Sequence, residues 1–89
     1  MTKFGFNNMT LSEKHDFLFI NRGDNYVKFI SYRKEVDLAV SLWDCGDFFA
    51  EVYATKKNKY PVKIEAIDLY DSRIDLYIDF ATLANDQVH

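Results

Sequence analysis

The stretch that decides the fold is VDLAVSLWDCGDFFAEVYAT, residues 36–55. Apolar residues occupy every second position on both sides of Gly46, at 36, 38, 40 and 42 and again at 48, 50, 52 and 54. Residues 62–67, VKIEAI, repeat this alternation at 62, 64 and 66. A period of two places successive side chains on opposite faces of an extended strand. The pattern therefore predicts an antiparallel sheet with one buried face and one partly solvated face.

Four strands follow from this pattern, at about residues 26–33, 36–43, 47–55 and 60–69. Between the second and third strands, parity favours a three-residue loop, 44–46, because it sets Leu42 opposite Phe48 on the buried face. Gly46 then occupies the left-handed position that such hairpins prefer. The first hairpin fits a loop of two residues or of three.

Both ends of the chain carry capping boxes, which mark helix starts. Thr10 and Glu13 predict a helix over about residues 11–20 that ends before Gly23. Four of its apolar residues are expected to face the sheet: Leu11, Phe17, Leu18 and Ile20.

The tail after Ser72 fits either a fifth strand, by alternation at 74, 76, 78 and 80, or a helix that Ser72 and Asp75 would cap. We favour the helix, because the sheet needs a cover for its apolar face. The prediction is a single α+β domain over residues 1–89. It is an antiparallel four-stranded β-meander flanked by an N-terminal and a C-terminal α-helix.

Composition is that of a small globular protein, with 48% hydrophobic and 28% charged residues among 89. The single cysteine, Cys45, excludes an internal disulfide. No apolar run approaches the roughly 18 residues that a membrane span needs. Residues 1–10 lack the pattern of a secretory signal. We therefore expect a cytoplasmic location and no association with membranes.

Residues that carry chemistry are few. The sequence shows no serine–histidine–aspartate set, no histidines at metal-ligand spacing and no glycine-rich phosphate loop. Asp44 and Asp47 flank Cys45 and disfavour a reactive thiolate. Asp71, Asp75 and Asp79, four apart, fit a solvated helix face better than a calcium or magnesium site. We expect no catalytic residues, no cofactor and no metal.

Charge is unevenly distributed along the chain. Residues 1–35 contain six Lys and Arg against four Asp and Glu, whereas residues 36–89 contain five against ten. The basic cluster of Lys56, Lys57 and Lys59 is a poor footprint for nucleic acid on a chain of net charge −3. The acidic excess would instead attract a basic protein partner.

A candidate partner interface follows from the predicted registers. A pairing of Ala54 with Val62 sets Ile67 opposite Phe49, on the same face as Trp43. The candidate interface on this second face comprises Trp43, Phe49, Tyr53, Ile67 and Leu69. Either the N-terminal helix covers this apolar end, or it is an exposed patch with an aromatic anchor for dimerisation or for a partner.

The function expected from these features is a non-enzymatic protein–protein interaction module. It would be an inhibitor or immunity-type protein that masks a basic partner, or a homodimer. The alternative is a small-molecule binder or minor enzyme with a tyrosine-lined pocket between sheet and helix, formed by Tyr53, Tyr60, Tyr70 and Tyr77 with the Asp68 carboxylate. Residues 43–53 resemble many small bacterial sheet proteins of unassigned role, a likeness that implies no functional residues.

Overall fold

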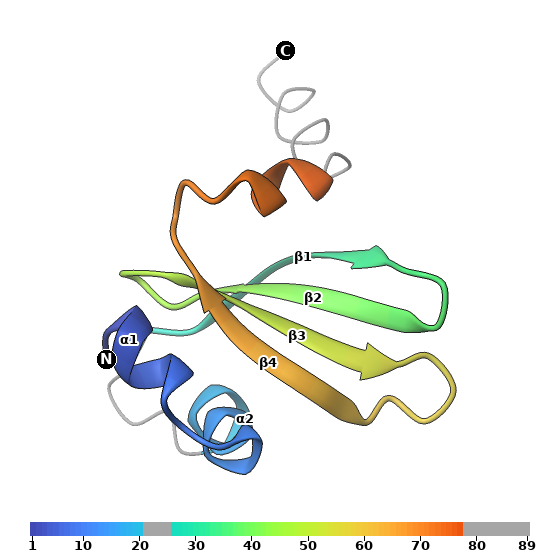
Figure 1. Ribbon diagram of the computed structural model, residues 1–89, viewed down its shortest axis with the longest axis horizontal. Coiled ribbons are helices and arrows are strands. Elements are labelled where there is room, and N and C mark those ends of the chain that lie inside the picture. The colour runs from blue at the N-terminus through green and yellow to red at the C-terminus, as the bar shows by residue number, and fades with distance from the viewer. Residues whose placement is uncertain (21–25, 78–89) are drawn as a thin grey trace.

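The computed structural model describes residues 1–20 and 26–77 and shows an α+β fold around one four-stranded antiparallel sheet (Figure 1). The strand order is β1-β2-β3-β4, so the predicted meander is confirmed. The elements are α1 (Lys3–Asn7), α2 (Leu11–Phe19), β1 (Lys28–Lys34), β2 (Leu38–Asp44), β3 (Phe49–Thr55), β4 (Pro61–Ile67) and a short 3-10 helix, η1 (Ser72–Leu76).

Helix α2 begins as the capping box predicts. The Thr10 hydroxyl accepts the Glu13 backbone N–H, and the Glu13 carboxylate accepts the Thr10 N–H. Phe17 and Leu18 are buried, whereas Leu11 and Ile20 are exposed, so the predicted inward face was wrong for these two. Helix α1 was not predicted, because five residues capped by Thr2 carry too little periodicity to recognise.

The β2–β3 register corrects the sequence-based pairing. Trp43 lies opposite Ala50 and Leu42 opposite Glu51, so the predicted pairing of Leu42 with Phe48 was wrong. The connection is one residue longer than expected: residues 45–48 form the loop, and the Cys45 N–H donates to the Phe48 carbonyl at 3.0 Å. Gly46 does adopt the left-handed conformation, with φ +89°.

The other two hairpins show the β1–β2 loop length, which the sequence left open, and the β3–β4 register. A two-residue turn joins β1 to β2, closed by a hydrogen bond from the Glu35 N–H to the Leu38 carbonyl at 2.8 Å. A bulge then interrupts β1 between Phe29 and Ser31. Between β3 and β4, Phe49 lies opposite Ile67 as predicted. Ala54 pairs with Pro61 rather than Val62, because the register shifts at the hairpin end.

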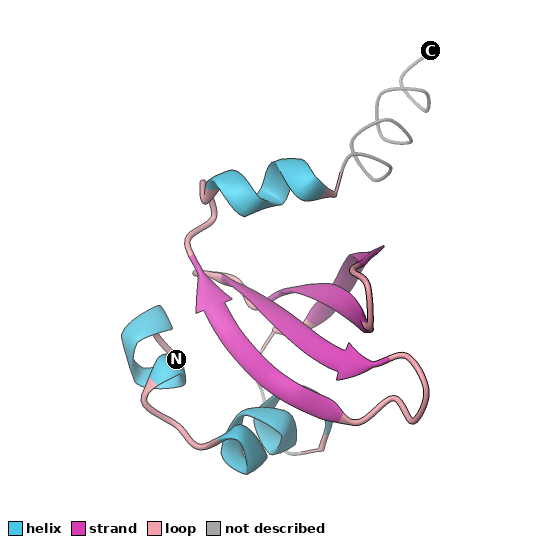
Figure 2. Cartoon of the chain, turned by 45° about the vertical axis from the view of Figure 1, so that its right-hand side comes forward, coloured by secondary structure: helices cyan, strands magenta, loops and turns pink. Residues whose placement is uncertain are grey.

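Both faces of the sheet are covered (Figure 2), α1 and α2 lying on one side and η1 on the other. The larger core, on the helical side, consists of Phe6, Phe17, Leu18, Phe48, Ala50, Val52, Ile64 and Ala66. A smaller core on the opposite face consists of Leu42, Ile67 and Tyr77, with Ile30, Phe49 and Ile74 packed against it. This explains the register error, because parity fixes the pairing only when all strands send their apolar residues to one face.

In the described part of the C-terminal segment, Ser72–Leu76 form a 3-10 helix rather than an α-helix. Asp71, not Ser72, caps η1, through a hydrogen bond from the Arg73 N–H to the Asp71 carboxylate at 2.8 Å. Residues 78–89, which would continue the predicted helix or fifth strand, lie outside the described residues. Within residues 1–20 and 26–77, no helix has both the length and the apolar character to cross a bilayer.

Candidate functional site

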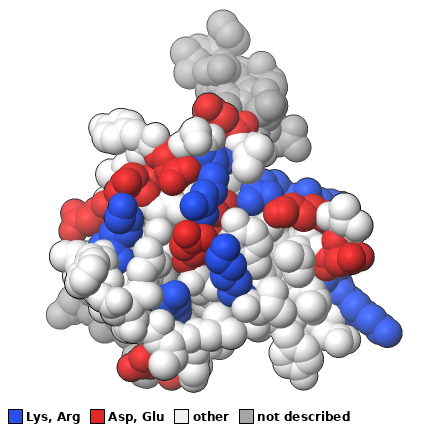
Figure 3. All heavy atoms as spheres, in the orientation of Figure 1, with Lys and Arg blue, Asp and Glu red and all other residues white. Residues whose placement is uncertain are grey.

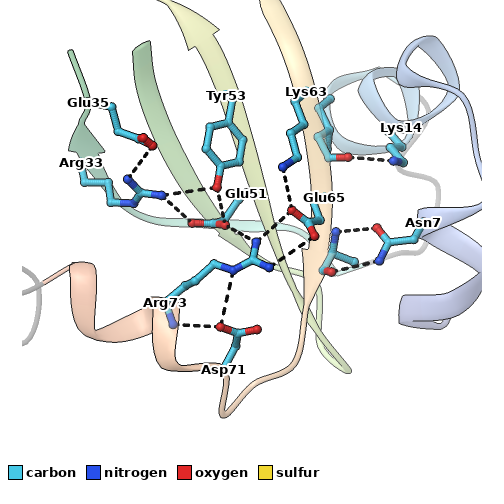
Figure 4. A network of polar contacts seen from close by, with 12 residues as sticks. Asn7, Lys14, Arg33, Glu35, Glu51, Tyr53, Lys63, Glu65, Asp71 and Arg73 are labelled. Carbon is cyan, nitrogen blue, oxygen red and sulfur yellow. Dashed lines mark hydrogen bonds and ion pairs between the residues drawn. The ribbon is translucent and has the colours of Figure 1, made fainter. Parts of the chain in front are cut away.

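A buried carboxylate lies at the centre of β3, on the face that η1 covers. The Glu51 side chain has 0% exposed surface. Its two oxygens accept hydrogen bonds from the Tyr53 hydroxyl at 2.9 Å and from the Tyr77 hydroxyl at 2.8 Å (Figure 4 shows the surrounding network). A buried carboxylate without such donors would be strongly unfavourable. These tyrosines therefore supply part of the solvation that Glu51 lost on folding.

Two arginines complete the surroundings of Glu51, one from each side. Arg33 on β1 approaches Oε2 at 3.4 Å, and Arg73 on η1 approaches Oε1 at 3.2 Å. Each arginine also pairs with a second, more exposed carboxylate: Arg33 with Glu35 at 3.3 Å and Arg73 with Glu65 at 2.9 Å. The network thereby ties η1 to β1, β3 and β4 through charge-assisted hydrogen bonds.

The surroundings in this network move the pKa values of several of its groups further from pH 7. Burial, followed by the hydrogen bond to Glu51, raises the pKa of Tyr77 and of Tyr53. The hydrogen bond with Arg73 lowers the pKa of Glu65 and raises that of Arg73. General acid–base catalysis favours a group whose pKa lies near the working pH. These shifts thus give no support to the tyrosines as catalytic acids or bases, and they fit a fixed structural network.

A surface groove of about 370 Å³ lies beside this network, where the chain leaves β4. Its lining residues are Asp47, Asp68, Leu69, Tyr70 and Asp71. Because Asp71 caps η1 and its carboxylate lies 3.7 Å from the Arg73 Nε, the Glu51 network also holds this wall of the groove in place. We call this feature the acidic groove.

The electrostatics of the acidic groove favour a cation. Lys3 pairs with Asp68 at 2.8 Å, but both side chains remain substantially exposed. Asp47, across the groove, makes no ion pair with any described residue. Figure 3 shows acidic side chains gathered on the left of the view, at the end of the sheet where β4 ends. Tyr70 presents its ring at this end with 96% of its surface exposed.

The five residues of the candidate interface do not form one surface. Trp43 lies on the helical face, edge-on to Phe19 at 5.0 Å between ring centroids, because it pairs with Ala50. Phe49 and Ile67 pack in the smaller core on the opposite face, where Ile67 is only 3% exposed.

Of the remaining members, Tyr53 lies on the same sheet face as Phe49 and Ile67, whereas Leu69 follows the end of β4. Tyr53 points to Glu51, and only Leu69 borders the acidic groove. The placement of Trp43 and Phe49 on one face was therefore wrong, and the register is the reason. A role of Leu69 in partner binding stays a prediction.

The four tyrosines of the alternative hypothesis do not gather around one pocket. Tyr53 and Tyr77 donate to Glu51, Tyr70 lines the acidic groove, and Tyr60 follows the β3–β4 turn at the other end of the sheet. Asp68, the carboxylate assigned to that pocket, does line the acidic groove together with Tyr70. The five residues thus fall into two separate pairs, Tyr53 with Tyr77 and Tyr70 with Asp68, while Tyr60 lies apart from both.

Cys45 and the aspartates are the other residues that the sequence singled out. Burial, and to a smaller degree the charge of Asp44, raises the pKa of the Cys45 thiol to about 12. Across residues 1–20 and 26–77, no group of three or more potential metal ligands converges. Asp79 lies outside the described residues.

Sequence reasoning missed the Glu51 network. Glu51 was not among the candidate residues, because a glutamate in an alternating strand usually faces water. The available signal was the position of Glu51 between the apolar residues Ala50 and Val52 at the middle of the strand. Its charged partners, however, come from β1 and η1, which only the folded chain brings close. Comparisons with protein-family models, curated proteins and solved structures return no match to this chain.

Proposed function

We propose that this protein is a non-enzymatic interaction module that binds a basic segment of a partner protein in the acidic groove. The observation that carries the proposal is the composition of the groove: three carboxylates, from Asp47, Asp68 and Asp71, beside the exposed ring of Tyr70. An arginine or lysine side chain inserted there would meet carboxylates and could stack on the aromatic face. Leu69 would contact the aliphatic part of the same side chain.

In this proposal the protein masks a basic surface of its partner, as inhibitors and immunity proteins do. Opposite charge across an interface accelerates encounter and selects partners, so binding should weaken as salt concentration rises. The cytoplasm is the proposed location, and the free thiol of Cys45 fits a reducing compartment. The groove needs no second copy of the chain to be complete.

A labelled peptide of alternating arginine and serine tests the proposal, with a glutamate–serine peptide as its charge-reversed counterpart. We expect the arginine peptide to bind the wild type, and the double variant Asp47→Asn/Asp68→Asn to bind it about tenfold more weakly. The matched control is Asp37→Asn, an exposed aspartate in the β1–β2 turn at the other end of the sheet. Equal binding to the double variant and to the wild type would remove the acidic groove from the proposal.

Tyrosine variants separate the contribution of aromatic stacking to peptide binding from the contribution of charge. Tyr70→Ala should weaken binding of the arginine peptide severalfold, whereas Tyr60→Ala should leave it unchanged. Tyr60 is the matched control, because its side chain is 68% exposed and lies at the opposite end of β4.

A small cationic ligand is the second candidate, because a volume of about 370 Å³ is within the range of small-molecule sites. Arginine amide is the probe that discriminates. If it binds as tightly as the whole arginine peptide, the groove recognises a small cation. If it binds far more weakly, contacts along a peptide contribute and the interaction module is supported.

A further inference from the structure

The two edge strands of the sheet, β4 and β1, differ in whether other parts of the described chain bond to their outward backbone groups. On β4 the backbone groups that point away from β3 belong to residues 62, 64 and 66, because residues 63, 65 and 67 bond to β3. The Asn7 side chain donates to the Ala66 carbonyl at 3.0 Å and accepts the Ala66 N–H at 2.8 Å. Lys14 donates to the Ile64 carbonyl at 2.8 Å (Figure 4). Side chains of the N-terminal helices thus occupy the β4 edge in place of another strand.

Strand β1 forms the other edge, and its backbone groups also alternate between pointing to β2 and pointing outward. Glu35 bonds to Leu38 across the turn, so Arg33 and Ser31 also point their backbone groups to β2 in the regular part of the ladder. The N–H and C=O groups of Tyr32 and Lys34 consequently point away from the sheet. Among the described residues, these groups have no hydrogen-bond partner.

Exposed side chains accompany this open backbone. The Tyr32 side chain is 60% exposed, and Phe29 is 47% exposed although its ring packs edge-on against Trp43 at 5.3 Å. Aromatic side chains at an accessible edge are typical anchors for a partner. Lys28 and Lys34, both exposed, stand at the two ends of the strand.

The charge of β1 identifies the occupant. Of its three charged residues, Arg33 is paired with Glu51 and Glu35, whereas Lys28 and Lys34 have no ion pair among the described residues. Pairing with a second copy would therefore place four uncompensated lysines on one interface. Like charges on paired strands are destabilising, and edge lysines are a common device against self-pairing. A strand that carries carboxylates meets no such repulsion.

We infer that β1 is a docking edge for an extended acidic segment of a partner protein, which adds as a fifth strand beside Tyr32 and Lys34. Backbone hydrogen bonds supply affinity in this mode of recognition, and the flanking side chains supply selectivity. This inference does not rest on the acidic groove, which lies at the end of β4 and favours the opposite charge.

The probe is an acetylated, amidated seven-residue peptide of alternating glutamate and valine, tested against its lysine–valine counterpart. We expect the glutamate peptide to bind and to shift the NMR amide signals of Tyr32 and Lys34. A copy of the peptide with N-methyl groups on alternate amides, which cannot form the ladder, should bind about tenfold more weakly. This comparison leaves the protein unaltered, so it holds even where a variant fails to fold.

Variants test the protein side. Tyr32→Pro removes the outward N–H at a position where an edge strand tolerates proline, and it should weaken binding about tenfold. Tyr32→Ala is the control that keeps the amide, and it should weaken binding less. Lys34→Glu should reverse the preference between the two peptides.

Several results would overturn the inference. These are no binding of the glutamate peptide at millimolar concentration, equal binding of its N-methylated copy, and equal binding of the lysine peptide. A wild type that sediments as a dimer, and as a monomer after Tyr32→Pro, would assign the edge to a second copy instead. Loss of arginine-peptide binding at the acidic groove would leave this inference unaffected, since the two probes differ in charge and site.

Discussion

Removal of the Glu51 carboxylate should cost this protein a large part of its stability. The substitution is Glu51→Ala, and the effect follows from what the change leaves behind. Tyr77, 2% exposed, loses the acceptor of its hydroxyl, and an unsatisfied buried donor costs about 1–3 kcal/mol. Arg33 and Arg73 lose their shared buried partner but keep Glu35 and Glu65. Breaking a buried pair from one side costs about 3–5 kcal/mol.

Because both arginines keep a second partner, we expect the free energy of unfolding to fall by an amount near the lower end of this range, about 3 kcal/mol. An 89-residue chain has a total of roughly 5–13 kcal/mol, so the loss is a quarter of it or more. With a urea m-value of about 1.5 kcal/mol/M, the unfolding midpoint should fall by about 2 M. Urea denaturation followed by tryptophan fluorescence measures this directly, since Trp43 packs in the folded chain against Phe19.

Glu35→Ala is the matched control. It removes the other partner of Arg33, but that carboxylate is 39% exposed and should contribute less than about 1 kcal/mol. Amide exchange adds a local measurement, because Glu51→Ala should expose the N–H groups of Ile74 and Tyr77 that η1 protects. If Glu51→Ala shifts the midpoint no more than Glu35→Ala does, the carboxylate is solvated and the argument for a buried network fails.

Three further predictions test other parts of the molecule. Trp43→Glu should destabilise the monomer by about 3 kcal/mol, because the charge would enter the contact with Phe19, and a thermal melt as late as that of the wild type would contradict this. Cys45 should react with iodoacetamide much more slowly than free cysteine at pH 8, given its pKa of about 12, and comparable rates would show an accessible thiolate. The lowered pKa of Glu65 contributes stability that is present above the unfolded-state pKa, 4.5, and is lost as the pH falls through the lower folded-state value. Glu65→Gln should therefore flatten the acid limb of the stability–pH profile, and an unchanged limb would contradict the coupling to Arg73.

The sequence was sufficient for the order and pairing of the strands, because each hairpin is local and its alternation is strong. It was not sufficient for the face to which each strand sends its apolar residues. Val40 and Leu42 lie on the sheet face that η1 covers, whereas Ala50 and Val52 face α1 and α2. The alternation of each strand is unchanged when the strand shifts by one residue, so a two-sided core removes the constraint on which the parity argument depended.

The sequence indicates acidic residues in this part of the chain, but it does not indicate which residues come together to line the acidic groove. An acidic excess after residue 64 is visible in the sequence, and Asp68 and Asp71 from this part of the chain line the groove. Asp47 joins it from the β2–β3 loop only because that loop has four residues and lies beside the end of β4. Contacts of this kind depend on tertiary geometry, which no local pattern records.

Glu51 offers a physical reason why the observed register wins over the predicted one. In the observed pairing Leu42 lies opposite Glu51 and Val40 opposite Tyr53, so apolar side chains from β2 share a face with the carboxylate and its tyrosine donor. The β1–β2 register sets Arg33 opposite Val40, so Arg33 comes within reach of Glu51 across β2. With the predicted pairing, β2 would turn its apolar residues away from Glu51. The carboxylate would then face the more polar side of β2 and would be more open to water.

The hydrophobic pattern tolerates both pairings, whereas the buried charge is satisfied by the observed one. Polar groups in a core select one arrangement in some proteins even where they add little stability. By this reasoning Glu51 specifies the register of the sheet as well as the position of η1, and through Asp71 it also fixes one wall of the acidic groove.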